Sequence, residues 1–193
     1  MAQQSEHQRA AKTLPPMRIG EVVLRTARFD AMNRWWQTVL GISPHLESER
    51  FAFRRLPSDY PYTEQLIIFN QPELEGCESS GPGLDHVQFR HASLGALLDR
   101  YEVLRDLGIK PERTMNHGPS TSFYYRDPDG NRVELSAVNF PTEAEYVSFV
   151  ASEAFKKNIA GMAINADEFV SKYRSGVPQS ELVRLSLSGR GDR

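Results

Sequence analysis

Hydrophobic positions along this chain follow two periods, and the order of the periods occurs twice. Over residues 19–26 apolar and polar positions alternate, which predicts a half-buried strand. The next stretch has Asp30 as a candidate N-cap and Gly41 as a stop. Between them apolar residues recur at helical spacing: Met32, Trp35, Trp36, Val39 and Leu40. Three short strands are predicted next, at 45–49, 51–56 and 65–70, so this half reads β-α-β-β-β.

The second half repeats this order after a stretch rich in Gly, Ser and Pro at 71–83. A strand is predicted at 84–91 and a helix at 93–107, which Gly108 should end. Strands at 111–116, 120–125 and 132–138 complete the half. A shift of 65 residues places His86 on Glu21 and Arg90 on Arg25. An internal duplication is the simplest explanation.

The repeated order predicts an α+β fold in which two paired βαβββ modules form a curved, cup-like mixed sheet with helices on the outside. We expect a flexible N-terminal arm at 1–16, which lacks any apolar period. The domain itself should span 17–139, with module one at 17–70, a linker at 71–83 and module two at 84–139. A C-terminal helical extension and tail should follow at 140–193. Its helices are expected at 142–155, with Thr142 as cap, and at 167–173, and the Ser/Gly/Arg end of the chain should be frayed.

The hairpin at 116–136 carries the candidate chemistry. Strand alternation places Glu134 mid-strand on a polar face, and Tyr124 lies on the preceding strand. If the first strands of the two modules lie side by side, Glu21 and His86 share the concave face, and Glu134 completes a three-ligand set. Two carboxylates and one imidazole suit Fe(II), Mn(II) or another divalent first-row ion. A half-buried hairpin with a solvated outer face is the structural alternative.

Composition excludes several other classes of function. The net charge of −2 over 193 residues gives no indication of a nucleic-acid or anionic-membrane partner. No apolar run is long enough to span a bilayer or to act as a signal segment. The single Cys77 cannot form an intrachain disulfide, and an isolated cysteine is more often structural than nucleophilic. We therefore expect a cytoplasmic protein.

Two segments resemble the vicinal oxygen chelate superfamily, the group of glyoxalases, bleomycin-resistance proteins and extradiol dioxygenases. They are GLDHVQF around His86 and FYYRDPDGNRVELS, which ends the second module. The resemblance covers about residues 17–139. It implies metal ligands on the first strand of each module and on the last strand of the second. In this sequence those positions are Glu21, His86 and Glu134.

Within that superfamily the spacing is most similar to the ring-cleaving extradiol dioxygenases. His117 follows His86 by 31 residues, and Tyr124 precedes Glu134 by 10. The resemblance implies that His117 exchanges a proton with the substrate and that Tyr124 donates a hydrogen bond at the metal. It also implies Fe(II), a catechol-like aromatic substrate and O2 as partners. We further expect a homodimer.

Departures from the dioxygenase pattern leave two other functions open. Those dioxygenases have His where this chain has Glu21, and they carry a further His where Gln71 follows Asn70. The carboxylate that glyoxalases use falls near Leu66, which cannot bind a metal. One alternative is a non-redox isomerase, epimerase or lyase, with the metal as Lewis acid and Glu21 as base. The other is a metal-free protein that sequesters a small molecule, like the bleomycin-binding relatives.

Overall fold

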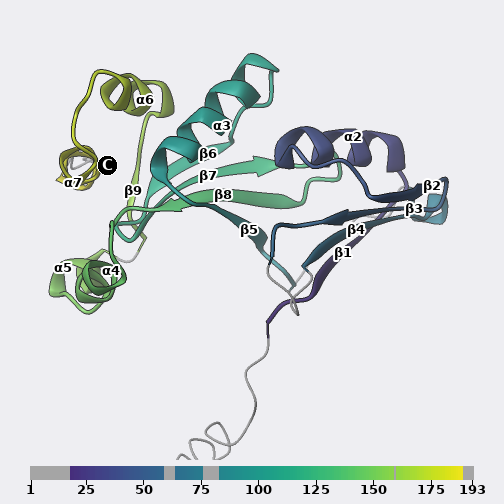
Figure 1. Cartoon of the computed structure of the whole chain (residues 1–193), viewed down its shortest axis with the longest axis horizontal. Helices are drawn as coiled ribbons and strands as arrows, with labels where there is room; N and C mark the ends of the chain where they lie inside the picture. Colours follow the sequence, from purple (N-terminus) through teal and green to yellow (C-terminus); the bar gives the residue numbers. More distant parts are fainter. Residues whose placement is uncertain (1–17, 59–63, 76–82, 159, 189–193) are drawn as a thin grey trace, which may run out of the picture. The chain divides into compact units, whose positions relative to one another are not determined.

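The computed structural model describes residues 18–58, 64–75, 83–158 and 160–188, and the chain divides into two compact units, Met1–Gly76 and Cys77–Arg193 (Figure 1). Each unit is described by itself. The predicted arm at 1–16 lies outside the described residues, and so does most of the predicted linker.

The first unit is one βαβββ module. Its elements are β1 (Glu21–Thr26), α2 (Phe29–Leu40), β2 (Leu46–Ser48), β3 (Phe51–Arg55) and β4 (Gln65–Asn70), followed by the 3-10 turn η1 (Pro72–Leu74). The sheet order is β1-β4-β3-β2, with β1 parallel to β4 and the other pairs antiparallel. Met32, Trp36 and Val39 of α2 are buried and form the core together with Leu66 and Ile68 of β4.

The start of α2 differs from the prediction, whereas its end agrees with it. Arg28 occupies the N-cap position without a side-chain hydrogen bond. The prediction of Asp30 as the cap is therefore wrong. Its carboxylate lies in the first turn, where its negative charge interacts favourably with the positive end of the helix dipole. Gly41 ends the helix with φ 69° and donates its N–H to the Gln37 carbonyl at 2.9 Å.

The second unit contains the same order of elements. These are β5 (His86–His91), α3 (Leu94–Asp106), β6 (Arg113–Asn116), β7 (Ser120–Arg126) and β8 (Arg132–Val138). The sheet order is β5-β8-β7-β6-β9, and β5 runs parallel to β8 as β1 does to β4. The α+β class with two βαβββ modules is thus confirmed. Among the described residues each module forms a hydrogen-bonded sheet of its own.

In its described residues, the C-terminal extension adds a strand and four helices to the second unit. They are α4 (Glu143–Val150), α5 (Glu153–Lys157), β9 (Met162–Ala163), α6 (Ala166–Arg174) and α7 (Gln179–Ser188). Thr142 caps α4 as predicted, accepting the Glu145 N–H at 3.3 Å. The single helix expected at 142–155 is wrong, because it breaks at 151–152 and Ser152 caps α5. Helix α7 was not predicted, and the Ser/Gly/Arg end that was expected to fray lies mostly outside the described residues.

Buried amides attach this extension to the sheet. Asn116 donates to the Val183 carbonyl of α7 at 2.7 Å, and Asn139 donates to Asn116 at 3.0 Å and to the Gly118 carbonyl at 2.8 Å. A buried amide without partners would cost about 1–3 kcal/mol, more than the roughly 0.5–1.5 kcal/mol that one hydrogen bond contributes. These contacts therefore fix both the β6–β7 turn and α7.

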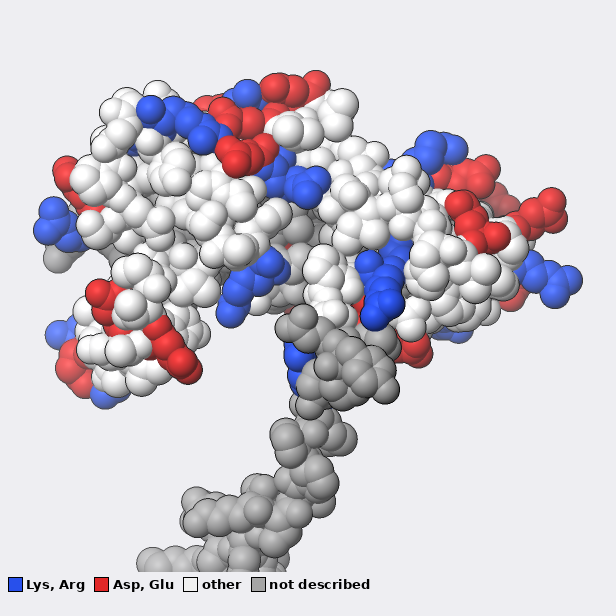
Figure 2. Space-filling model, in the orientation of Figure 1, with Lys and Arg blue, Asp and Glu red and all other residues white. Residues whose placement is uncertain are grey.

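Charged side chains are spread over the face seen in Figure 2, with acidic and basic groups interspersed. In the part of the chain that the structure describes, no helix has both the length and the hydrophobicity needed to cross a bilayer.

Gly161 provides a test of how the extension docks. A Cβ there would lie 2.3 Å from the Asn116 carbonyl oxygen and 2.6 Å from the His117 Cα, and φ is +76°. Gly176 has a similar φ of +88°, but a Cβ added there would meet no other residue within 4 Å. It is therefore a matched control. Both Ala variants should lose roughly 1–2 kcal/mol for the left-handed backbone. The free energy of unfolding of Gly161→Ala, measured in urea, should fall by about 1–3 kcal/mol more, because the backbone at Asn116 and His117 would have to move. Equal losses in the two variants would mean that the close approach is absent.

Candidate active site

The second sheet gathers the candidate residues on one face through strand register. Parallel pairing sets Gln88 of β5 opposite Glu134 of β8, and antiparallel pairing sets Tyr124 of β7 opposite Glu134 from the other side. Residues opposite each other on neighbouring strands share a face, and alternate residues of one strand do the same. His86, two residues before Gln88, therefore lies on this face as well.

His86 and Glu134 form a close pair. The His86 Nε2 lies 2.8 Å from the Glu134 Oε2. Each residue is also held through its second polar atom, since the His86 Nδ1 lies 2.7 Å from the Asp85 carboxylate and Gln88 donates to the Glu134 Oε1 at 2.7 Å. The Glu134 side chain is 4% exposed and that of His86 33%, so the imidazole provides the open side of the pair.

This arrangement suits a metal ion. A carboxylate only accepts hydrogen bonds, so the His86 Nδ1 carries a proton toward Asp85 and the Nε2 presents its lone pair to Glu134. Two lone pairs at 2.8 Å repel unless a proton or a cation lies between them. Neighbouring N and O ligands bound at about 2.1 Å and at right angles would lie about 3 Å apart. The residues present therefore fit a divalent metal with little movement.

His117 and Tyr124 form a second pair on the same face. The His117 Nδ1 lies 2.9 Å from the Ala160 carbonyl, which can only accept, so in the neutral ring the proton lies on Nδ1. The Nε2 is 2.8 Å from the Tyr124 hydroxyl, which then donates to it. The ring centroids of His86 and Tyr124 are 5.7 Å apart. The phenol thus lies between the proposed proton carrier and the His86–Glu134 pair.

Burial raises the pKa of Tyr124 above its ordinary value, and the charge of Glu134 raises it further. Arg113 opposes this shift, with its guanidinium carbon 4.4 Å from the ring centroid. The phenol is therefore protonated near neutral pH and able to donate a hydrogen bond.

Glu21 is the one predicted ligand that lies in the first unit, at the exposed start of β1 opposite Gln65. No group of three or more His, Cys, Asp or Glu side chains in the described segments forms a complete metal site. Four of the five predicted site residues are thus brought together, as His86 with Glu134 and His117 with Tyr124. The position of Glu21 in the site stays a prediction.

Several polar residues around these pairs were missed in the sequence. Gln88 shares a strand face with His86 by the rule of alternate residues, so this signal was available. Asp85 precedes His86 directly, but its contact depends on the rotamer. Arg113 and the Ala160 carbonyl could not be found from sequence, because strand pairing and the path of the extension bring them to Tyr124 and His117.

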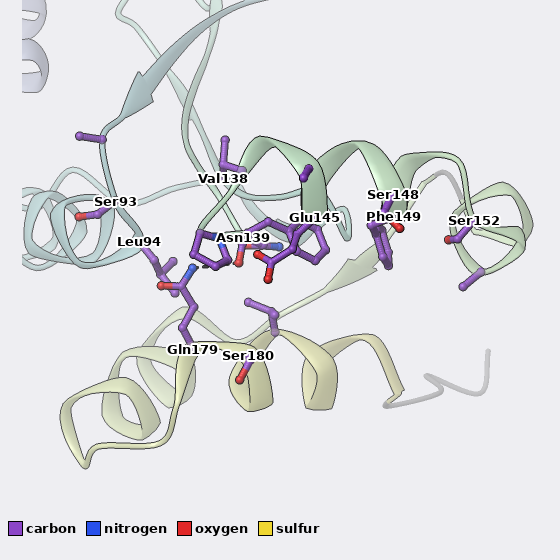
Figure 3. A pocket seen from close by; sticks show the side chains of 16 residues that line it. Ser93, Leu94, Val138, Asn139, Glu145, Ser148, Phe149, Ser152, Gln179 and Ser180 are labelled. Atoms are coloured by element: carbon purple, nitrogen blue, oxygen red, sulfur yellow. Dashed lines mark hydrogen bonds between the residues drawn. The ribbon is translucent and has the colours of Figure 1, made fainter.

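A separate cavity of about 1170 Å³ lies at the end of β8 (Figure 3). Val138 and Phe140 line it beside Phe149 of α4 and Val183 of α7, and Gln179 donates to the Asn139 carbonyl at 3.0 Å at its edge. None of the five predicted site residues lines this cavity. The extension therefore lines a cavity together with the end of β8 and the start of α3. It also contributes the Ala160 carbonyl to the candidate site.

Residues 18–135 match the model of the Glyoxalase/Bleomycin resistance protein/Dioxygenase superfamily. The chain therefore belongs to this superfamily, as the two sequence segments and the two modules indicated.

Two relatives from Rhodococcus globerulus are similar over most of their length. Biphenyl-2,3-diol 1,2-dioxygenase 3 is 38% identical over 169 residues, covering 86% of this chain and 87% of the relative. Biphenyl-2,3-diol 1,2-dioxygenase 2 is 33% identical over 166 residues, covering 86% of each. These relatives are dioxygenases and imply an enzyme with a divalent metal.

Solved structures agree on the fold. A lactoylglutathione lyase from Agrobacterium tumefaciens superposes with a TM-score of 0.52 at 23% identity, covering 64% of this chain and 96% of its own. A glyoxalase/bleomycin resistance protein/dioxygenase from Nocardioides gives 0.51 at 19% identity, covering 70% and 93%. At these identities the likeness concerns the fold alone.

The tautomer of His117 can be tested directly. Long-range 1H–15N spectra at pH 8 should show the proton on Nδ1, because the Ala160 carbonyl accepts it. Tyr124→Phe should leave this tautomer unchanged and remove only the hydroxyl contact, at a cost of about 1 kcal/mol in unfolding free energy. A proton on Nε2 in the wild type would reverse the direction of the Tyr124 hydrogen bond and contradict this site.

Proposed function

We propose that this protein is an extradiol-type dioxygenase that cleaves the ring of a catechol-like aromatic substrate with O2. The observation that carries the proposal is the His86–Glu134 pair with the His117–Tyr124 pair beside it. The names of the two Rhodococcus globerulus relatives support an aromatic diol as substrate.

Glu21, His86 and Glu134 would hold the metal, Fe(II) by preference, with Mn(II) or another first-row ion as the alternative. When bound, Fe(II) supplies the Lewis acidity and the redox chemistry that cleavage of an aromatic ring by O2 requires. His86 offers its Nε2 because Asp85 engages the Nδ1, and Glu134 offers one oxygen because Gln88 engages the other. Each of these two ligands thus presents one donor atom.

His117 is the proposed proton carrier. Imidazole accepts and returns protons near neutral pH. The His117 Nε2 faces the Tyr124 hydroxyl at 2.8 Å. Tyr124 donates its proton to this nitrogen and can turn it instead toward a substrate oxygen. The Ala160 carbonyl holds the ring in place while Nε2 gains or loses a proton.

Metal binding is the first test. His86→Ala should lose stoichiometric Fe(II) or Mn(II) after anaerobic loading, because one of the two convergent donors is removed. His45→Ala removes an exposed histidine of the first unit and should keep full metal content. Retention of full metal by His86→Ala, with an unchanged circular dichroism spectrum, would contradict the site.

Catalysis by His117 is the second test. General acid–base catalysis is typically worth about 10²- to 10⁴-fold, so His117→Ala should lower kcat by that factor. Metal content and substrate affinity should remain close to those of the wild type. The assay is the coloured ring-fission product from a panel of catechols that includes biphenyl-2,3-diol, with His45→Ala as control. Unchanged turnover in His117→Ala would transfer the proton role to Tyr124 or Glu21.

The same panel separates the remaining alternatives. Turnover that proceeds without O2 would indicate a non-redox isomerase, epimerase or lyase. Tight binding of a small molecule by metal-free protein, with no turnover, would indicate sequestration.

A further inference from the structure

Asp85 and its neighbours form a line of alternating charge that ends at His86. The Asp85 Oδ1 lies 2.7 Å from the His86 Nδ1, and Arg132 Nη1 donates to both carboxylate oxygens of Asp85 at 2.9 Å. Arg132 is also the residue directly opposite His86 in the β5–β8 pairing. The contact that orients the imidazole is therefore anchored to the strand that carries Glu134.

The line continues beyond Arg132. Arg126 and Arg132 are cross-strand neighbours, and two like charges in that position would repel each other. Glu112 resolves this, because its two oxygens accept from Arg126 Nε at 2.8 Å and from Arg132 Nε at 3.1 Å. The order Arg126–Glu112–Arg132–Asp85–His86 alternates in sign, and each side chain restricts the next.

Asp85 accepts hydrogen bonds from the His86 Nδ1 and from Arg132. A carboxylate accepts such bonds at both oxygens. The Asp85 side chain is 70% exposed, so its ion pair with Arg132 adds little to the stability of the fold. An exposed carboxylate held by Arg132 against one ring nitrogen is better suited to orientation than to folding.

We propose that Asp85 is a positioning residue that fixes His86 as a ligand through Nε2, and that Arg132 acts on the site by holding Asp85. Metal-bound histidines usually donate their other N–H to a carboxylate or carbonyl group, which fixes the tautomer and the plane of the ring. This inference rests on the proposed metal site, and it assigns a role to two residues that touch neither metal nor substrate.

The test uses Zn(II) as a diamagnetic probe and Fe(II) under anaerobic conditions, with affinities measured by chelator competition. Asp85→Ala should weaken the binding of both ions about 10- to 100-fold, which is the usual cost of losing a hydrogen-bond partner of a metal ligand. Asp85→Asn keeps an acceptor without the charge and should fall between the wild type and Asp85→Ala. Asp106→Ala removes an exposed aspartate that is likewise paired with an arginine, Arg105, and should bind as the wild type does.

A spectroscopic readout distinguishes positioning from a general structural effect. In the Zn(II)-loaded wild type the His86 Nδ1–H should give a slowly exchanging proton resonance, which Asp85→Ala should lose and Asp85→Asn should keep. Arg132→Met should weaken binding less than Asp85→Ala. If Arg132 acts only through Asp85, the double variant should bind no more weakly than Asp85→Ala alone.

The outcomes separate the two proposals. If wild-type protein binds neither ion, the metal site fails and the role of Asp85 fails with it. If the wild type binds stoichiometrically and Asp85→Ala binds within about twofold of it, only the positioning role is overturned. An unchanged His86 proton resonance in Asp85→Ala would also overturn it.

Discussion

The parallel pairing of β5 with β8 is the constraint on which the candidate site depends. It fixes Gln88 opposite Glu134 and Arg132 opposite His86, so both metal-ligand candidates of the second unit meet their partners through one register. A slip of one residue would turn the alternate side chains of β5 to the other face of the sheet. Helix α3 packs against both strands and stabilises this register, because its Leu94, Leu97, Leu98 and Leu104 are completely buried.

Around this pairing the structure places polar groups in two layers. The inner layer is the set of atoms that face one another: the His86 Nε2, the Glu134 Oε2 and the Tyr124 hydroxyl with the His117 Nε2. The outer layer holds three of these residues through their remaining polar atom. Asp85, Gln88 and the Ala160 carbonyl do this for His86, Glu134 and His117 respectively. Because His86, Glu134 and His117 are each held through a second polar atom, their reactive atoms have a defined direction before any substrate binds.

The C-terminal extension contributes to the site through backbone rather than through side chains. β9 lengthens the sheet beside β6, and the loop before it brings Gly161 so close to Asn116 and His117 that a Cβ would clash. This approach places the Ala160 carbonyl on the His117 ring. The relatives from Rhodococcus globerulus are similar over 169 and 166 residues, which is more than the superfamily match at 18–135 covers. Part of their similarity therefore lies outside the two modules.

The sequence by itself determined the two modules and indicated four candidate site residues that the structure brings close together. Period-two and period-3.6 patterns are local, and the repeat at 65 residues carries them from one module to the other, so β1, α2, β5, α3 and β8 were predicted close to their observed bounds. The strand position of Glu134 follows from alternation, whereas its shared face with Tyr124 depends on the register of β7 and β8. Errors arose where local signals were weak: Asp30 has the residue type of a cap, but α2 begins before it.

Only the tertiary structure decided which residues hold these side chains in place. Arg132 and Asp85 are 47 positions apart, and His117 and Ala160 are 43 apart, so no local pattern joins them. Strand β9 and helix α7 have weak patterns of their own and are stabilised by contacts with β6 and by buried amides such as Asn116. Hydrogen bonds between distant segments depend on register and rotamer, which are properties of the packed chain, whereas periodicity is a property of the sequence.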